Sequence, residues 1–173
     1  MLKSVIIIGT SRSNGNTRLA VDILREHFES DLIDLNDYQI SYYDYGHGNS
    51  DDDYLPLMKR ITDAYDLVIL ATPVYWYSMS GVIKVFFDRL TDLLEIDKDT
   101  GRRLRGKKMA VVSTSLGDNI GDSFWLPFKE VARYLGMTYT GNIEVNFKNA
   151  ETKNEGFVRL REFAGQIISF PAQ

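Results

Sequence analysis

Residues 5–17 read Val5-Ile6-Ile7-Ile8-Gly9-Thr10-Ser11-Arg12-Ser13-Asn14-Gly15-Asn16-Thr17. A short apolar run comes first, a loop of small hydroxyl and amide residues follows, and a helical pattern begins near Arg18. The stretch therefore predicts a strand that leads through a polar loop into a helix. The first N–H groups of a helix have no intrahelical partner and carry partial positive charge, so this loop is suited to an anion.

Side chains of the same loop can add to the anion site. Its hydroxyl and amide groups can donate to phosphate oxygens, and the Arg12 guanidinium adds a fixed positive fork. The P-loop needs a Lys that is absent here, and the dinucleotide fingerprint needs three glycines where only Gly9 and Gly15 occur. A flavin mononucleotide would present one terminal phosphate of the required kind. The alternative is a plain strand-to-helix turn with Asn16 or Thr17 as the N-cap.

The bulk composition restricts the classes of function. The length of 173 residues suits one domain, expected to span residues 1–173. A net charge of -4 argues against a general nucleic-acid binder, and the absence of cysteine excludes disulfides and cysteine-ligated clusters. No apolar run approaches the roughly 20 residues of a membrane span. No signal-peptide pattern precedes the first strand, so we expect a soluble cytoplasmic protein.

Apolar runs alternate with helical patterns along the whole chain. Strands are expected at about residues 3–9, 31–35, 66–71, 109–112 and 137–145. Helices are expected from about residue 18, at 52–65, from 78 to 94, at 125–135 and at the end of the chain. Residues 36–53 are expected to form a long surface loop, and 95–108 a charged, exposed segment. Five strand–helix units predict an α/β fold, with a parallel sheet covered by helices on both faces.

Open parallel sheets bind ligands beyond the carboxyl ends of their strands, near the switch in strand order. If the order is 2-1-3-4-5, the loops at 10–17 and 72–78 flank that switch, and the loop after the fourth strand lies beside them. The second loop, Pro73-Val74-Tyr75-Trp76-Tyr77-Ser78, carries three consecutive aromatic residues that suit a flat ring. The third loop, Ser113-Thr114-Ser115-Leu116-Gly117, is small and polar, so its backbone can approach a ring edge. Together the three loops describe a flavin site, whereas the aromatic residues alone could be a surface patch or a subunit contact.

Two sequence blocks carry a resemblance to a known family. Residues 9–17 resemble the phosphate loop of the NAD(P)H-dependent FMN reductases. Residues 72–81, which continue into Lys84, Phe87, Asp88 and Arg89, resemble the second signature of that family. The resemblance covers nearly the whole chain. It implies a flavodoxin-like, three-layer doubly wound sandwich with a five-stranded sheet of order 2-1-3-4-5, non-covalently bound FMN, and assembly into dimers or tetramers.

The resemblance also implies which residues hold the cofactor. The phosphate would be held by Thr10, Ser11, Arg12, Asn14, Asn16 and Thr17, the ribityl chain and ring by Pro73, Val74, Tyr75, Trp76, Tyr77 and Ser78, and the far side of the ring by Ser113, Thr114, Ser115 and Gly117. Iron–sulfur members carry a cysteine motif where this chain has residues 40–51, so no cluster can form here. The loop at 36–53 is either a lid over the ring, which we prefer, or an inert surface excursion. His47 in that loop could reach the site, but we expect a solvated histidine, and His27 to be structural or solvated.

The implied activity is FMN-dependent reduction of quinone-, flavin-, azo- or nitro-type acceptors by NADPH or NADH in ping-pong turnover. The flavin would do the chemistry, and no catalytic side chain and no metal are expected. The alternatives are a flavodoxin-like electron carrier and a non-catalytic flavin-binding module. A homodimer is expected through the helix after the aromatic loop, because its apolar residues exceed one stripe. These residues are Val82, Ile83, Val85, Phe86, Phe87, Leu90, Leu93 and Leu94.

Overall fold

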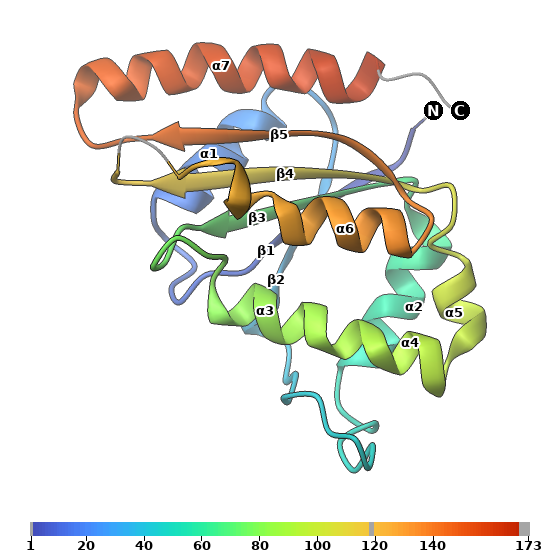
Figure 1. Ribbon diagram of the computed structural model, residues 1–173. Helices are drawn as coiled ribbons and strands as arrows, with labels where there is room; N and C mark the ends of the chain where they lie inside the picture. The colour runs from blue at the N-terminus through green and yellow to red at the C-terminus, as the bar shows by residue number, and fades with distance from the viewer. Residues whose placement is uncertain (1, 118–119, 170–173) are drawn as a thin grey trace.

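A five-stranded parallel sheet of order β2-β1-β3-β4-β5 lies at the centre of the protein (Figure 1). The structure, a computed structural model, describes residues 2–117 and 120–169. The strands are β1 (Ser4–Ile8), β2 (Asp31–Asp34), β3 (Leu67–Pro73), β4 (Lys108–Ser115) and β5 (Thr138–Asn146). Every pair of neighbouring strands runs parallel. The predicted flavodoxin-like α/β fold and its strand order are therefore confirmed.

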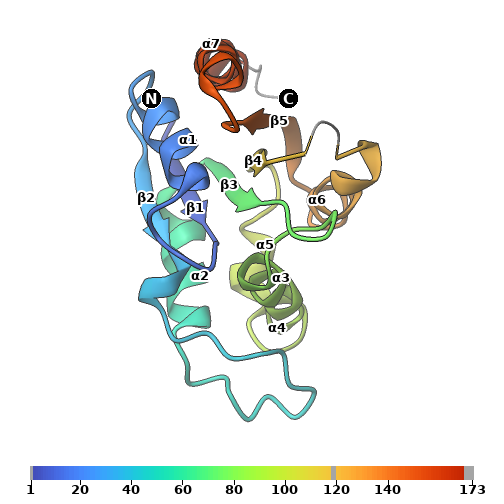
Figure 2. The ribbon, with the colours of Figure 1, turned by 90° about the vertical axis from the view of Figure 1, so that its left-hand side faces the viewer.

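Helices cover both faces of this sheet. One face carries α1 (Asn16–Arg25) and α7 (Ala150–Ser169), and the other carries α2 (Tyr54–Ala64), α3 (Gly81–Asp88) and α6 (Leu126–Tyr134) (Figure 2). Alternate residues of a strand point to opposite faces, so Ile6 joins the core under α1 and α7 while Ile7 joins the core under α2 and α3. Every residue of β1 and β3 is buried, as expected for strands that are covered on both sides.

The central strands extend further than the sequence predicted. We expected β3 to end at Ala71 and β4 at Val112, but the strands continue to Pro73 and Ser115. The added residues are polar or proline, which hid their strand character. They pair across the sheet as Thr72 with Ser113 and Pro73 with Thr114, and all four are buried. Residues assigned to two site loops are therefore the last residues of two strands.

The helical expectations also need two corrections. The helix predicted from residue 78 to 94 is α3, followed without a gap by the 3-10 helix η2 (Arg89–Thr91) and by α4 (Asp92–Glu95). The segment 95–108 is not wholly exposed, because it contains α5 (Lys98–Arg102) and buries Thr100, Gly101 and Leu104. Asp97 caps α5 by accepting from the Thr100 N–H at 3.2 Å. The remaining short helices are η1 (Leu35–Asp37) and η3 (Asp122–Phe124).

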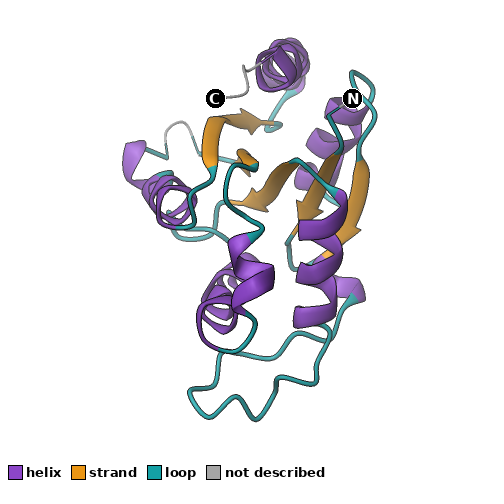
Figure 3. Cartoon of the chain, turned by 90° about the vertical axis from the view of Figure 1, so that its right-hand side faces the viewer, coloured by secondary structure: helices purple, strands orange, loops and turns teal. Residues whose placement is uncertain are grey.

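The loop predicted at residues 36–53 begins at residue 38, because Asn36 and Asp37 lie in η1. It is the long teal segment at one end of the molecule in Figure 3, and a buried arginine anchors it. The Arg89 side chain is fully buried and pairs with Asp52 of the loop at 2.5 Å and with Asp92 at 2.6 Å. It also donates to the Ser41 carbonyl at 3.1 Å. Burial raises the pKa of Asp52, but hydrogen bonds from Arg89 and from backbone N–H groups outweigh it and leave that pKa below its ordinary value.

His47 belongs to this anchor rather than to open solvent. Its Nδ1 lies 3.2 Å from Asp92 Oδ1, and its Nε2 lies 3.1 Å from Glu95 Oε2. The expectation of a solvated histidine is therefore wrong, because two carboxylates outside the loop's own sequence hold the ring. Tyr42 and Tyr45 remain exposed on the same loop.

Tyr54 lies under the Arg89 anchor and generates a prediction about stability. Its ring is fully buried 4.8 Å from the Arg89 guanidinium carbon, and in the described part of the chain its hydroxyl has no hydrogen-bond partner. Burial raises the pKa of the Tyr54 phenol well above its ordinary value. An unsatisfied buried hydroxyl is destabilising, so Tyr54→Phe should raise the free energy of unfolding by about 1 kcal/mol in urea titration.

The matched control is Tyr139→Phe. The Tyr139 hydroxyl donates to Asn142 Oδ1 at 3.0 Å, so its loss should lower the free energy of unfolding by about 1 kcal/mol. If both variants lose stability equally, the Tyr54 hydroxyl has a partner in solution and the prediction is wrong.

Candidate functional site

The loops after β1, β3 and β4 meet at the carboxyl edge of the sheet, which Figure 2 shows from the front. The Thr17 and Thr114 hydroxyls lie 2.7 Å apart and join the start of α1 to the end of β4. The Ser11 and Tyr75 hydroxyls lie 2.8 Å apart and join the polar loop to the aromatic loop. The structure therefore brings together the three segments that the sequence singled out.

The loop between β1 and α1 presents unused donors. α1 begins at Asn16, and no side chain caps its first turn in the described residues, so its first N–H groups are free of intrahelical partners. Arg12 and Asn14 are exposed, and Arg12 forms no ion pair with the residues that the structure describes. Thr10 and Thr17 are buried. An uncapped helix end beside an unpaired arginine is suited to one anionic group.

Asn36 supports this loop and was missed by the sequence reasoning. Its side-chain amide donates to the Thr10 carbonyl at 2.9 Å. Its position in the sequence could have indicated this role. Asn36 comes shortly after the end of β2, and β2 lies next to β1, so the two strands end side by side at the carboxyl edge of the sheet. The Asn36 amide holds the Thr10 backbone and also lies 3.5 Å from the Ser13 hydroxyl, so Asn36 fixes the loop at two points.

The aromatic loop is a two-residue hairpin turn with an unusual composition. The N–H of Tyr75 donates to the Ser78 carbonyl at 2.9 Å, and the N–H of Ser78 donates back to Tyr75 at 3.0 Å. The central residues Trp76 and Tyr77 have φ values of 50° and 61°, which is the geometry that normally selects Asn-Gly. Large aromatic residues in this region are strained by about 1–3 kcal/mol each. Trp76 and Tyr77 are 95% and 75% exposed, so packing of their side chains within the protein does not offset the cost of that strain.

Tyr75 lies between the turn and the polar loop. A hydrogen bond with Ser11 is the main cause that lowers the pKa of the Tyr75 phenol below its ordinary value. Val74 fastens the start of the turn to the sheet, since its N–H donates to the Thr114 carbonyl at 2.8 Å. Pro73 ends β3 and is buried, so the exposed part of the loop is limited to residues 75–78.

The loop after β4 divides into buried and open parts. The Ser113 hydroxyl donates to the Thr72 carbonyl at 3.1 Å, and Thr114 is engaged by Thr17, so both hydroxyls are used inside the protein. Leu116 and Gly117 are exposed, and a side chain added at Gly117 would meet no heavy atom within 4 Å. The backbone after Ser115 is thus the part of this segment that a ligand can approach.

The fold and these loops define a flavodoxin-like protein with an anion loop and an exposed aromatic turn at the switch in strand order. The chain belongs to the NADPH-dependent FMN reductase family, whose model matches residues 2–152. The predicted family is therefore confirmed. Members of this family use FMN as cofactor and NADPH or NADH as electron donor, and this chain is an oxidoreductase of that kind.

Three relatives illustrate the similarity. The chain is 29% identical to the NAD(P)H-dependent FMN-containing oxidoreductase YwqN of Bacillus subtilis over 153 residues, which cover 82% of this chain and 83% of YwqN. It is 34% identical to an FMN-dependent NADPH-azoreductase of Staphylococcus aureus over 98 residues. These residues cover 51% of this chain and 52% of the azoreductase. The solved structure of a Trp repressor binding protein from Bacillus subtilis superposes on this chain with a TM-score of 0.73 and 24% sequence identity. The superposition covers 92% of this chain and 98% of that protein.

The residues present fit FMN. One terminal phosphate matches the uncapped start of α1 and the exposed Arg12, and a flat ring matches the exposed aromatic turn. None of the described helices is long and apolar enough to cross a bilayer.

The strained turn generates a testable prediction. The double variant Trp76→Asn/Tyr77→Gly should raise the free energy of unfolding of the cofactor-free protein by about 1–2 kcal/mol, because Asn-Gly adopts this turn without strain. The same variant should bind FMN about tenfold more weakly, because two aromatic ring contacts are lost. Urea unfolding and titration with FMN measure the two effects.

The control for this experiment is Tyr134→Asn, which removes another exposed aromatic side chain at the end of α6. It should leave FMN affinity unchanged. Equal weakening of FMN binding by both variants would remove the aromatic turn from the site.

Proposed function

We propose that this protein reduces quinone-, flavin-, azo- or nitro-type acceptors with electrons from NADPH or NADH. The observation that carries the proposal is the exposed, strained turn at Trp76 and Tyr77 beside the anion loop. An exposed aromatic surface suits planar acceptors, whereas an acidic or basic pocket would select charged ones. The azoreductase relative supports acceptors of this class.

The residues have separate tasks in this proposal. The phosphate is held by the loop of Thr10, Ser11, Arg12, Asn14, Asn16 and Thr17, the ribityl chain and ring by the segment Pro73, Val74, Tyr75, Trp76, Tyr77 and Ser78, and the ring edge by the segment Ser113, Thr114, Ser115 and Gly117. Within these segments the buried Pro73, Ser113 and Thr114 support the backbone, and the exposed residues face the ligand. When bound, FMN supplies the hydride transfer chemistry. The chain binds and orients the reactants and keeps water from them, and no side chain acts as general base.

Turnover is proposed to be ping-pong. One flat flavin ring with one open face cannot hold nicotinamide and acceptor stacked together, so the two have to occupy the same place in succession. The chain contains no cysteine, and therefore no cysteine-ligated cluster can carry electrons to a second site. Because the donor is NAD(P)H, we place the activity in the cytoplasm.

An electron carrier of the flavodoxin type is the second candidate, and a non-catalytic flavin-binding module is the third. The net charge of -4 favours the enzyme over the carrier, because carriers that dock on redox partners through charge are usually far more acidic. The carrier and the module should both fail to react rapidly with NAD(P)H.

The proposed reaction predicts fast reduction and parallel kinetic lines. The purified protein should be yellow and release FMN on denaturation, and stopped-flow mixing with NADPH or NADH should bleach the flavin before a quinone restores the colour. Steady-state rates at several quinone concentrations should give parallel double-reciprocal lines. If neither nucleotide bleaches the flavin within minutes, the reductase proposal fails and the carrier takes its place.

We also propose a homodimer, or a tetramer built from it, through α3 and its extension. Most of the apolar residues on this helix are used by the protein's own core, because Ile83, Phe86, Phe87, Leu90 and Leu93 are buried. Val82 and Val85 are partly buried and Leu94 is 40% exposed, so these three residues provide the surplus surface. Val82 and Val85 line an open pocket of about 670 Å³ that a second copy would cover.

Light scattering tests the assembly. The protein should scatter as about twice its monomer mass of 19.8 kDa at low micromolar concentration. Val85→Glu should shift it toward monomer, because a charge would be desolvated in the contact, while Lys98→Glu on α5 should leave the mass unchanged. A monomer for the unaltered protein would contradict the proposal.

A further inference from the structure

Strand β5 sends two polar side chains to the loop that follows β4. Glu144 and Asn146 are two residues apart, so they lie on the same side of the strand. Ser115 donates its hydroxyl proton to Glu144 Oε1, and the Asn146 amide donates to the Gly117 carbonyl at 2.8 Å. Residues 115–117 are therefore held by β5 from outside their own loop.

The Asn146 side chain is itself held in a fixed orientation. Its amide oxygen accepts from the Lys148 N–H at 2.8 Å, so its nitrogen is the atom that faces Gly117. The Gly117 carbonyl has this donor whether or not Ser115 also donates to it. Asn146 thus fixes the backbone of the loop independently of Glu144.

Ser115 has one hydroxyl proton and two acceptors within reach. Its oxygen lies 3.1 Å from the Gly117 carbonyl and also contacts Glu144 Oε1. A hydrogen bond to a carboxylate is stronger than one to a neutral carbonyl, so the proton points to Glu144 while that side chain is charged. The charge of Glu144 therefore sets the direction of the Ser115 hydroxyl at the end of β4.

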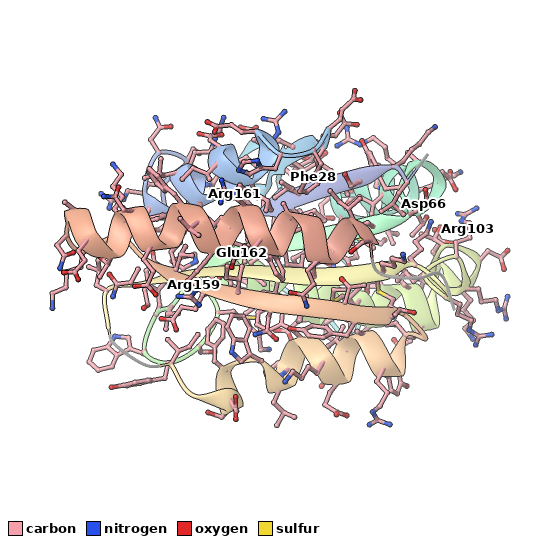
Figure 4. The ribbon with its side chains drawn as sticks, turned by 90° about the horizontal axis from the view of Figure 1, so that it is seen from above. Phe28, Asp66, Arg103, Arg159, Arg161 and Glu162 are labelled. Carbon is pink, nitrogen blue, oxygen red and sulfur yellow. The ribbon has the colours of Figure 1, made fainter. Side chains whose placement is uncertain are left out.

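No described residue forms an ion pair with the Glu144 carboxylate, which is partly buried. Glu144 shares a pocket of about 330 Å³ with Asp122 and with Arg159 of α7, the helix that packs along β5 (Figure 4). Because Ser115 is in direct contact with the Glu144 carboxylate, the field of this charge acts on the loop after β4.

We propose that Glu144 is a positioning residue for the loop after β4 and that its charge makes reduction of the bound FMN less favourable. This inference rests on the proposed function, in which residues 113–117 border the ring edge. Reduction by NAD(P)H transfers a hydride, which is one proton with two electrons, and so adds one negative charge to the ring. A carboxylate beside the loop disfavours that added charge and lowers the affinity for reduced FMN more than for oxidised FMN.

The test compares Glu144→Gln with the unaltered protein. Glutamine keeps the side-chain length and an acceptor for Ser115 but removes the charge. Binding of oxidised FMN, measured by fluorescence titration, should stay within about twofold. The ratio of affinities for reduced and oxidised FMN should rise about threefold to tenfold, and a tenfold change makes the midpoint potential ~30 mV more positive for a two-electron couple.

Two further variants complete the design. Ser115→Ala keeps the Glu144 charge but removes the hydroxyl, so it should weaken binding of oxidised FMN about threefold and leave the potential near that of the unaltered protein. Glu26→Gln removes an exposed carboxylate after α1, at the opposite end of the sheet, and should change neither quantity. Thermal unfolding of each cofactor-free variant verifies that it folds.

The outcomes separate this inference from the proposed function. An unaltered protein that binds no FMN would overturn both. If the unaltered protein binds FMN but Glu144→Gln has the same potential, or loses oxidised FMN while still folded, Glu144 does not act as proposed. A more positive potential in Glu144→Gln alone supports the proposal.

Discussion

The fully buried Ser80 side chain ties together the segments from which the site is built. Its hydroxyl donates to the Gly9 carbonyl at 2.7 Å and accepts from the Ile83 N–H at 3.2 Å, and its own N–H donates to the Thr72 hydroxyl at 3.0 Å. One residue therefore connects the ends of β1 and β3 to the start of α3. Because Ser80 is 0% exposed, loss of its hydroxyl would remove the hydrogen bonds to the Gly9 carbonyl and the Ile83 N–H in a buried environment, which is destabilising. The hydrogen bonds of Ser80 fix the ends of β1 and β3 and the start of α3 relative to one another, and the site loops are attached to these ends.

The close approach of α3 to β1 depends on glycine. A side-chain carbon added at Gly9 would lie 2.6 Å from the Ile83 side chain, so a larger residue would push the helix away. That displacement would also separate Ser80 from the Gly9 carbonyl. The glycine at position 9 and the Ser80 hydrogen bonds therefore act as a single constraint on the distance between β1 and α3. The strained turn at Trp76 and Tyr77 persists because hydrogen bonds hold the segments on both sides of it.

The five strands, the three loops and the family could be predicted from the sequence because each rests on a contiguous stretch of the chain, whereas the strand order was implied by the family resemblance. Apolar runs mark buried strands, and the polar loop and aromatic loop are contiguous in the chain. The Arg89 anchor could not be predicted, since its partner Asp52 is 37 positions away and a buried ion pair has no local signature. The position of His47 was misjudged for the same reason. The ends of β3 and β4 were missed because their residues are polar or proline, and residues of these types are mostly exposed. Here the Ser113 hydroxyl is satisfied by the Thr72 carbonyl and the Thr114 hydroxyl by Thr17 of α1.

The charges around the candidate site are arranged in two separate places. Positive character lies at the start of α1 and at Arg12, whereas the negative Glu144 lies beside the loop after β4. A phosphate binds its donors equally well whatever the redox state of a distant ring, so the first group sets affinity alone. A charge near the ring changes the oxidised and reduced forms unequally, so the second group sets how readily reduction occurs. Since β5 supplies Glu144 and the β1–α1 loop supplies Arg12, substitutions in one segment can alter one property without altering the other.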